Sequence, residues 1–438
     1  MAVSTHTFQA PKGTRDFYPD DMAVRRYLES VWRRVSVNHG FDEIDGPTFE
    51  HLDLYTVKSG PEIVSELFSF RRAGGDTDYA LRPEFTPTLA RMYAARANAL
   101  PRPTNWFSIC SFFRAERPQR GRLREHFQWN LDVIGEDYPR ADARIIAAAV
   151  DVLDRLGLTP GDVQITLNHR EDLEAMLSHY GFDGSRLVEA IALVDAVSKL
   201  PADEFRRRAL DLGLDAGRWD EFAGALACRQ HAAQGCSMEH LQPLHEKLEE
   251  FGVLPWCTYA PSLARGLAYY TGTVFEVHEV SGTERAVAGG GRYDNLVELF
   301  GGPPTPAVGI AMGDVVIRLL LKDKGLLEPA RDFRPRPDVF LICSGKEVAE
   351  QRFESLLASL RRADLHVRHS SRSTRNVGKL LGEAARVRAR CAVILGDELE
   401  QGHVVVKDLD TGEQSDAVPV DGLADRLKKD LAGAAGSP

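Results

Sequence analysis

One basic stretch sets the architecture expected for this chain: residues 113–128 read FRAERPQRGRLREHFQ, with five arginines in eleven positions. Strand-like residues flank it, because 106–110 read WFSIC and 127–134 read FQWNLDVI. A proline and a glycine interrupt its middle, as turn formers do. The pattern predicts two antiparallel strands joined by a long basic loop.

The arginines of this loop suit a polyanion. Guanidinium groups stay charged at physiological pH and present planar forks of donors that match phosphate. Glu116 and Glu125 lie among them, so a solvated, salt-bridged hairpin tip fits the spacing equally well. Composition of the loop alone leaves both interpretations open.

Three motifs carry a family resemblance. Residues 113–119 and the glutamine that follows the loop resemble the second signature motif of class II aminoacyl-tRNA synthetases, in its histidyl form. Residues 265–276, RGLAYYTGTVFE, and 289–294, GGGRYD, resemble signatures of histidyl-tRNA synthetases. The similarity begins at KGTRD, residues 12–16, and covers nearly the whole chain.

Composition bounds the remaining possibilities. A chain of 438 residues with 27% charged residues is long enough for two or three globular domains. Its net charge of −10 argues against broad polyanion binding, so any nucleic-acid contact is expected to be local. Six cysteines without paired spacing indicate neither a zinc site nor a disulfide framework. No signal-like N-terminus or membrane-length apolar run is present, which predicts a cytoplasmic protein without a membrane partner.

The N-terminal region predicts a helix and a strand. Apolar residues recur at helical spacing over 21–39, and 41–50 alternates as a strand that Pro47 confines to an edge or an end. Helix, strand and proline in this order resemble the first class II motif. In the family that motif forms the dimer interface, so the resemblance implies a homodimer.

The segment 79–91 predicts a strand that breaks at Pro83 and restarts as a helix. From residue types alone, Thr86 is a helix cap and Glu84 is an exposed carboxylate. The resemblance implies instead that Glu84 and Thr86 hold the α-ammonium group of an amino acid.

A helical insertion is expected after the basic loop. Residues 142–156 predict a helix and 163–169 a strand, whereas 170–250 are almost wholly helical in pattern. The resemblance implies an insertion that touches the tRNA acceptor arm. The insertion's histidines are expected at the surface rather than as ligands: His179, His231, His240 and His245.

Two family positions differ here. Residues 307–317 occupy the third class II motif, but Val315 and Val316 stand where most synthetases have Glu-Arg, so the arginine that packs on adenine is absent. Ala268 stands where most histidyl enzymes have aspartate. The glycines at 289–291 permit an approach too close for a side chain, or positive φ values.

A proline-rich linker at 328–337 precedes a second domain. Strands alternate with helices there, which predicts a parallel or mixed sheet with helical crossovers. The strands are expected at 339–343, 365–368 and 392–395, the helices near 346–362 and 375–387, and a hairpin from 403. Residues 361–390 hold nine Lys or Arg against two acidic residues, a local charge of +7. A solvated basic helix would give the same count, but position and pattern resemble the family's anticodon-binding domain.

The expected fold is α+β: a class II synthetase-type, mostly antiparallel sheet with flanking helices, a helical insertion, and a C-terminal α/β domain of anticodon-binding type. The expected divisions are 1–169 and 251–327 for the two parts of the catalytic domain, 170–250 for the insertion, 328–337 for the linker and 338–438 for the anticodon-binding domain.

The resemblance implies a histidine–tRNA ligase that uses ATP and Mg²⁺ and acts on histidine and tRNA(His). The implied catalytic residues are Arg265 and Arg114. The implied histidine-binding residues are Glu84, Thr86, Gln128, Asp132, Tyr269 and Tyr270. The implied ATP-binding residues are Arg114, Glu116, Arg122 and Arg265. The implied tRNA-binding residues are Arg117, Gln119, Arg120, Arg124, Arg372 and Arg375. The magnesium ligands are not implied by any motif.

Three alternatives stay open at this point. One is a catalytically silent paralogue acting as a regulatory subunit or tRNA sensor, although such relatives usually lose several binding residues. Another is a class II synthetase for a different amino acid, which the two histidyl signatures disfavour. The third is an RNA-binding protein, which would not need an ammonium and imidazole pocket.

Overall fold

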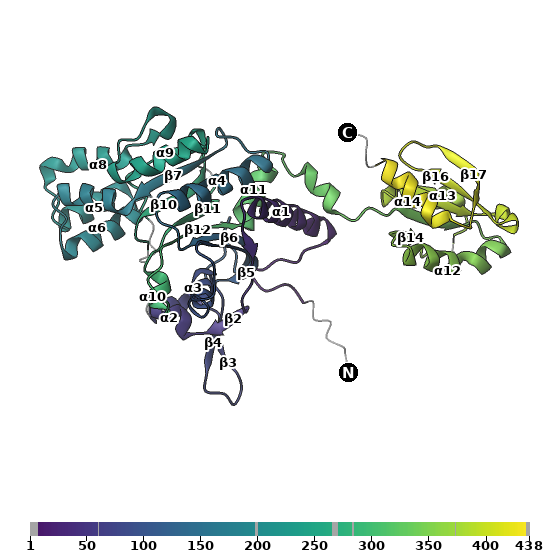
Figure 1. Cartoon of the computed structure of the whole chain (residues 1–438), viewed down its shortest axis with the longest axis horizontal. Helices are drawn as coiled ribbons and strands as arrows, with labels where there is room; N and C mark the ends of the chain where they lie inside the picture. Colours follow the sequence, from purple (N-terminus) through teal and green to yellow (C-terminus); the bar gives the residue numbers. More distant parts are fainter. Residues whose placement is uncertain are drawn as a thin grey trace. The chain divides into compact units, whose positions relative to one another are not determined.

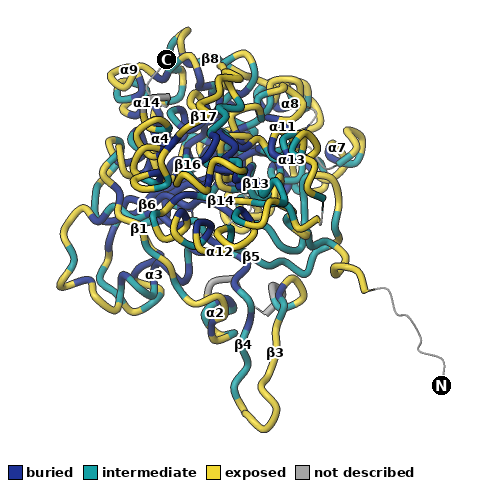
Figure 2. Tube along the Cα trace, turned by 90° about the vertical axis from the view of Figure 1, so that its right-hand side faces the viewer, coloured by how far each residue is buried: buried dark blue, intermediate teal, exposed yellow. Residues whose placement is uncertain are grey.

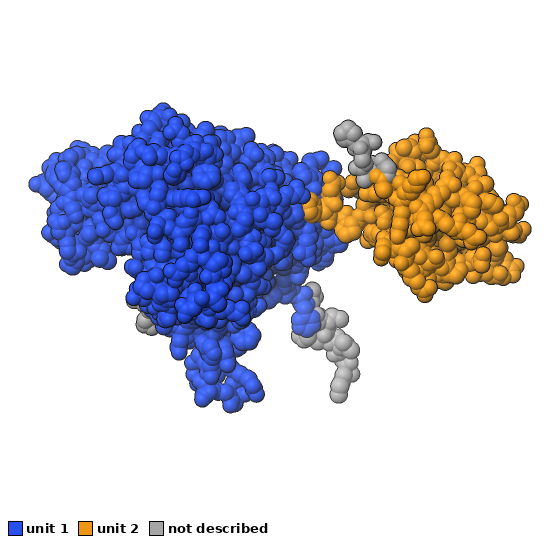
Figure 3. Space-filling model, in the orientation of Figure 1, with its two compact units in different colours: residues 1–331 blue, residues 332–438 orange. Residues whose placement is uncertain are grey.

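The chain divides into two compact units, Met1–Arg331 and Asp332–Pro438 (Figure 3). The computed structural model describes residues 8–59, 61–197, 200–264, 270–282, 284–372 and 374–434. No helix in these ranges is long and apolar enough to cross a membrane.

The first unit is built on a nine-stranded sheet with the order β1-β5-β6-β12-β11-β10-β7-β9-β8 (Figure 1). Neighbours are antiparallel except in the pairs β1–β5 and β7–β9. The strands are β1 (Asp42–Glu43), β5 (Thr104–Phe113), β6 (Glu125–Ile134), β7 (Val163–His169), β8 (Gln230–His231), β9 (Cys257–Tyr259), β10 (Thr273–Glu279), β11 (Ala288–Arg292) and β12 (Ala307–Gly313). This mostly antiparallel sheet confirms the predicted fold class.

The predicted hairpin is confirmed by β5 and β6, which pair in antiparallel register from Thr104 opposite Ile134 to Phe113 opposite Glu125. Strand β6 is buried from Phe127 onward, so both of its faces are covered. Because side chains alternate along a strand, odd and even positions of β6 serve different faces. Trp129 belongs to the odd set, and its Nε1 donates to Ser36 Oγ of α1 at 2.9 Å.

Helices α1 and α4 cover the odd face, and α3 and α10 lie on the other (Figure 1). Gln128, Asn130 and Asp132 are the buried polar residues at even positions, so the sheet turns them away from α1. The helices of this unit are α1 (Pro19–Asn38), α2 (Asp53–Ser59), α3 (Thr86–Ala94), α4 (Arg140–Arg155), α5 (Arg170–His179), α6 (Ser185–Asp195), α7 (Ala202–Asp211), α8 (Trp219–Ala227), α9 (Gln242–Glu250), α10 (Leu296–Leu299) and α11 (Asp314–Asp323). The predicted helices near α1 and α4 are confirmed within about two residues at each end.

The single strand expected over 41–50 is wrong. The segment forms the edge strand β1 and then β2 (Phe49–His51), which joins a separate sheet of order β2-β4-β3 (Figure 1). Its other strands are β3 (Ser69–Arg71) and β4 (Asp78–Leu81), which are labelled at the bottom of Figure 2. Pro47 has no N–H for a ladder, and Gly46 O instead accepts from Arg82 at 2.9 Å. These two features end β1 and redirect the chain.

The helical pattern expected after β7 is confirmed by α5 to α9, with one short strand, β8, between α8 and α9. The insertion has a core of its own, in which Phe182, Phe205 and Phe222 are buried. An independent core explains why helical periodicity dominated this part of the sequence.

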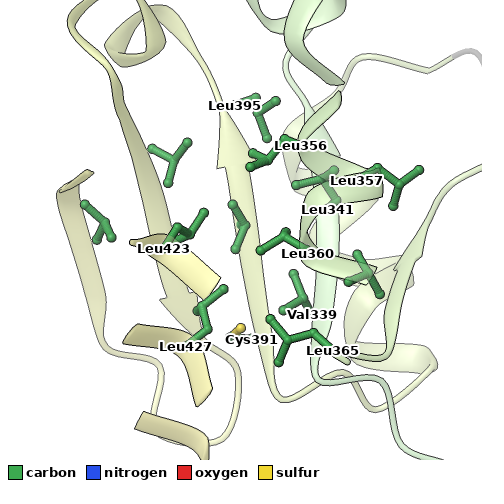
Figure 4. Packing of buried hydrophobic residues seen from close by; sticks show 14 of the residues in the cluster. Val339, Leu341, Leu356, Leu357, Leu360, Leu365, Cys391, Leu395, Leu423 and Leu427 are labelled. Atoms are coloured by element: carbon green, nitrogen blue, oxygen red, sulfur yellow. The ribbon is translucent and has the colours of Figure 1, made fainter. Parts of the chain in front are cut away.

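The second unit holds a five-stranded mixed sheet of order β14-β13-β15-β16-β17, as predicted. Its elements are β13 (Val339–Cys343), α12 (Glu347–Arg362), β14 (Val367–His369), α13 (Val377–Arg386), β15 (Cys391–Leu395), β16 (His403–Asp408), β17 (Gln414–Pro419) and α14 (Leu423–Ala434). Val339 and Leu341 pack with Leu357 and Leu360 of α12 on one side of the sheet, where α14 contributes Leu427 (Figure 4).

A buried ion pair ties α4 to the sheet of the first unit. Arg292, the last residue of β11, donates from Nε to Asp142 Oδ2 at 3.1 Å, and its NH2 group also bonds that oxygen. Both side chains are almost fully buried. Arg292 NH1 also donates to Asp294 at 3.0 Å, and Asp294 accepts the backbone N–H of Ala307 at the start of β12.

We expect Asp142→Asn to destabilise the protein by up to about 3–5 kcal/mol, because it removes the fully buried carboxylate that pairs with Arg292 and leaves the partly exposed Asp294 to compensate that charge. Urea denaturation of the variant and the parent protein measures this difference. Glu43→Gln is the matched control, since it breaks the ion pair with Arg33, which has a 2.6 Å contact but is largely exposed. That change should cost less than about 1 kcal/mol. Equal losses from the two substitutions would contradict the assignment of Asp142 as a structural anchor.

Candidate active site

The basic loop folds back on itself between β5 and β6. Arg114 N–H donates to Arg124 O at 2.9 Å, and Gln119 and Arg122 exchange backbone hydrogen bonds of 3.0 and 2.9 Å. Gly121 has a positive φ of 75°, which a side chain would strain. The loop is therefore an ordered hairpin tip rather than a loose run of charge.

A cavity of about 210 Å³ opens where this loop meets β10, β11 and the start of α11. It brings together three residues predicted from the sequence, Arg114, Arg122 and Gln128. The other lining residues are Gly121, Leu123, His126, Glu276, Ala286, Val287, Ala288, Gly289, Ala311, Gly313, Val315 and Val316. Two arginines, a glycine-lined floor and apolar walls suit a phosphorylated ligand with a flat ring.

Arg114 also touches the segment that was predicted to bind an ammonium group. Its Nε donates to Pro83 O at 3.1 Å, immediately before Glu84. The predicted helix begins at Thr86, but Phe85 is its N-cap, so the assignment of Thr86 as the helix cap is wrong, and Glu84 is half-buried rather than exposed. A carboxylate and a hydroxyl therefore lie at a strand-to-helix break next to the arginine of the cavity.

The polar residues on the even face of β6 form a hydrogen-bonded row. Gln128 Nε2 donates to Asn130 Oδ1 at 2.7 Å, and Asn130 Nδ2 donates to Ser108 Oγ at 3.3 Å. Next to this row, burial and, after it, the charge of Arg114 lower the pKa of His126 to about 3. His126 is therefore neutral at physiological pH and adds no charge to the cavity.

Asp132 ends this row in a tight pocket. Tyr293 O–H donates to its Oδ1 at 2.5 Å. A Cβ placed on Gly309 would lie 2.1 Å from the same oxygen, so only glycine fits opposite Asp132. Burial, opposed in part by the Tyr293 hydrogen bond, raises the pKa of Asp132 to about 7.

Glycines in β11 shape the same pocket. A Cβ on Gly290 would meet Gly309 O at 2.1 Å, and one on Gly291 would meet the Tyr270 ring at 2.7 Å. Neither glycine has a positive φ. Of the two expected reasons for glycine, close approach of neighbouring atoms therefore applies here and positive φ does not. Tyr270 is buried in one cluster with Phe85 and Tyr293, which puts its ring beside the Asp132 pocket.

The third-motif region lacks an arginine at the cavity. Val315 and Val316 line the cavity at the positions where the pattern has Glu-Arg. Arg318, one turn further along α11, is bonded to Asp21 of α1 and is not among the lining residues. Arg318 is therefore paired with α1 and does not take the place of the missing arginine at the cavity.

Several charged residues of the loop are paired. Arg122 forms an ion pair with Glu116, and Arg124 Nε donates to Glu116 O at 3.1 Å. Arg120 pairs with Glu284 and also reaches Asp323 at 3.3 Å.

The remaining predicted residues fall into two groups. Arg117 and Gln119 are exposed at the loop, and Arg372 and Arg375 are exposed in the second unit, where Arg375 pairs with Glu350. Arg265 and Tyr269 lie outside the described residues.

Two site residues were not assigned a role from the sequence. Glu276 on β10 presents a carboxylate to the cavity and hydrogen-bonds His278 at 2.9 Å. Tyr293 holds Asp132. Both belong to quoted motifs, and Glu276 is the one charged position in the run TVFEV of a mostly buried strand, a signal that could have identified it.

Comparison with protein families gives two matches. A family model described as histidyl-tRNA synthetase matches residues 13–314, and one described as an anticodon-binding domain matches residues 338–430.

Curated relatives match over nearly their whole length. A histidine–tRNA ligase of Opitutus terrae is 40% identical over 94% of this chain and 96% of its own. One of Haloarcula marismortui is 38% identical over 93% of this chain and 95% of its own.

Solved structures share the fold. A histidyl-tRNA synthetase from Nostoc sp. PCC 7120 superposes with a TM-score of 0.77 at 24% identity, covering 97% of this chain and 100% of that one. The apo enzyme from S. aureus gives a TM-score of 0.70 at 24% identity, covering 96% of this chain and 100% of that one.

Asp132 should make stability fall as pH rises. Its carboxyl has a pKa of about 7 in the folded protein against a reference value of 3.8. The folded state therefore retains a proton that the unfolded chain has lost, and this stabilisation, complete below about pH 4, disappears as pH rises through about 7. Asp132→Asn lacks that proton, so its stability relative to the parent should improve by a few kcal/mol, roughly 4, between pH 4 and pH 8. Urea denaturation at several pH values tests this, and parallel curves for the two proteins would contradict it.

Proposed function

The chain belongs to the histidyl-tRNA synthetase family, and we propose that its histidine–tRNA ligase activity is carried out around the cavity between the β5–β6 loop and β11. As an aminoacyl-tRNA synthetase, the enzyme joins histidine to tRNA with ATP. The observation that carries the proposal is the convergence of Arg114, Arg122 and Gln128 at one cavity, next to the buried Asp132.

In the first step the carboxylate of histidine attacks the α-phosphorus of ATP and pyrophosphate leaves. The protein's part is positioning and charge neutralisation. We assign Arg114 and Arg265 to the α-phosphate, where charge develops, and Arg122 with Glu116 to the rest of ATP. The pairing of Arg122 with Glu116 supports this assignment because it fixes the guanidinium at the cavity wall.

Histidine is assigned to the polar side of β6. Glu84, Thr86 and Gln128 would bind its α-ammonium group. Asp132 and Tyr270 would bind the two imidazole nitrogens, and Tyr269 is assigned to the same substrate from the sequence motif alone. The fixed position of Asp132 supports its role, because a preorganised partner rejects ligands that lack the matching group.

Adenine is assigned to the wall formed by Val315 and Val316. Without an arginine at these positions, the ring would be held by apolar contact rather than by a cation. ATP arrives with Mg²⁺, which prefers carboxylate and phosphate oxygens. Glu276 fits such an ion because its carboxylate lines the cavity, and the ion would neutralise phosphate charge there.

The tRNA is assigned to two surfaces. Arg117, Gln119, Arg120 and Arg124 belong to the loop at the mouth of the cavity, where the acceptor end must arrive. Arg372 and Arg375 belong to the second unit, whose match to an anticodon-binding domain supports a role in holding tRNA. A silent paralogue is disfavoured because the cavity keeps Arg114 and Gln128.

We expect pyrophosphate exchange to depend on histidine and on no other amino acid, because the pocket offers a carboxylate to an imidazole.

Arg114→Ala should lower the single-turnover rate of adenylate formation by about 10² to 10³, the usual loss when a preorganised donor to developing charge is removed. Rapid-quench assays with labelled ATP measure the rate.

Arg33→Ala is the matched control, since Arg33 is an exposed arginine of α1 that pairs with Glu43. It should leave the exchange rate unchanged. Exchange with none of the amino acids would reject the enzymatic role, and an Arg114→Ala loss below about tenfold would remove that residue from the catalytic set.

We also propose a cytoplasmic homodimer. Phe49 and Phe70 of the small sheet are each more than 40% exposed and pack around Tyr79, with ring centroids 5.6–5.8 Å apart. An exposed aromatic cluster of this kind suits burial against a second copy. Sedimentation equilibrium should give twice the mass of one chain, and a monomer at micromolar concentration would contradict the proposal.

A further inference from the structure

Three side chains of metal-ligand type meet outside the cavity, where the helical insertion joins the sheet. His169 ends β7, Glu171 lies in the first turn of α5, and His240 lies in the short 3-10 helix η4 (Glu239–Leu241). One ligand atom from each lies within 4.8 Å of the other two. The sequence predicted His240 to be a surface residue, but it is half-buried and bonded to two carboxylates.

The bonds of His240 match those of a metal ligand. Its Nδ1 lies 2.8 Å from Asp172 Oδ1, and its Nε2 lies 2.9 Å from Glu171 Oε2. A histidine ligand commonly donates its second nitrogen to a carboxylate, which leaves the first nitrogen's lone pair for the ion. Asp172 can serve as this carboxylate, because it also accepts the backbone N–H of His240 at 3.2 Å and is fixed in place.

The distance between Glu171 and His240 also suits an ion. Two ligand atoms that each lie about 2.1 Å from one tetrahedrally coordinated ion are roughly 3.4 Å apart. Glu171 Oε2 and His240 Nε2 lie 2.9 Å apart, so they would have to separate by about 0.5 Å to hold the ion. A small movement of the exposed Glu171 side chain would allow an ion to replace the shared proton.

His169 supplies the third position with a ring that is already oriented. It is buried, and its ring lies 5.3 Å from that of His240 at an interplanar angle of 13°. The Tyr138 ring lies 5.7 Å from it on another side. Glu171 N–H donates to its Nδ1 at 3.3 Å and so caps the N-terminus of α5, which means that an ion bound at Nδ1 would replace this helix cap.

We propose that His169, Glu171 and His240 bind a divalent transition metal ion, with Zn²⁺ the preferred one. Two imidazoles and one carboxylate suit Zn²⁺, Co²⁺ or Ni²⁺ rather than Mg²⁺. Glu171 and His240 are partly exposed, so water can fill the remaining coordination position.

The ion would join the two ends of the helical insertion to β7. Its neighbourhood includes Arg170, whose NH1 donates to Tyr270 O at 2.9 Å. The site therefore lies one residue from a contact with the histidine pocket proposed above, although the metal proposal does not depend on that function.

Calorimetric titration of the untagged, chelator-treated full chain with Zn²⁺ tests the site. The parent protein should bind one ion per chain, whereas His240→Ala and Glu171→Ala should bind at least tenfold more weakly. His179→Ala is the matched control, since it removes an exposed histidine from the end of the same helix and should bind as the parent does. Thermal melts of each protein show that it is folded, and Glu171 is exposed enough for its alanine variant to remain so.

Asp172→Asn tests the positioning role. It keeps the shape of the side chain but weakens its acceptance from His240, so Zn²⁺ affinity should fall 10- to 100-fold. Co²⁺ in place of Zn²⁺ should give a visible absorption band in the parent that His240→Ala loses. The proposal would be overturned if the parent did not bind Zn²⁺, or if His240→Ala and Glu171→Ala both bound it as tightly as the parent does, which would place the ion on other residues such as the cysteines.

Discussion

The buried pair of Arg292 and Asp142 is the contact on which the first unit depends. Arg292 ends the glycine strand β11, and Asp142 lies in the first turn of α4, so their bond connects the helical layer to the centre of the sheet. The same guanidinium holds Asp294, which in turn fixes the start of β12. Gly309 lies on β12 and Asp132 on the adjacent strand β6, so the position of the pocket depends on the ion pair of Arg292 and Asp142 that holds β12. A buried, hydrogen-bonded charge thus fixes α4, β11 and β12 relative to one another.

Much of the fold could be read from periodicity, because its signals are local. The hairpin of β5 and β6, helices α1 and α4, and the mixed sheet of the second unit each depend on residues close in sequence. The exception, 41–50, failed because Gly46 and Pro47 act through tertiary contacts: Arg82 bonds Gly46 O, and Thr88 leaves no room for a Cβ there. Alternation alone cannot distinguish one strand from two short strands in different sheets.

The site residues that could be predicted from the sequence are those whose side chains would bind a ligand directly, such as the charged Arg114 and the amide of Gln128. It was not predictable where a residue acts through a distant partner. Tyr293 acquires its role from Asp132, 161 positions away, and Arg318 is committed to Asp21, 297 positions away. From residue types Glu84 was only an exposed carboxylate, and its position beside Arg114 depends on the bond to Pro83. Such pairings follow from topology, which no local pattern contains.

The fit between Asp132 and Gly309 has a consequence for how this protein can vary. The carboxylate of Asp132 occupies the space that a Cβ at 309 would need, so the residues tolerated at one position depend on the residue at the other. A larger residue at 309 becomes tolerable only after the side chain at 132 has shortened or turned away. The effects of changes at the two sites should therefore be strongly non-additive, with the order of mutations deciding which sequences are reachable. Positions 132 and 309 should therefore change together during evolution rather than one at a time.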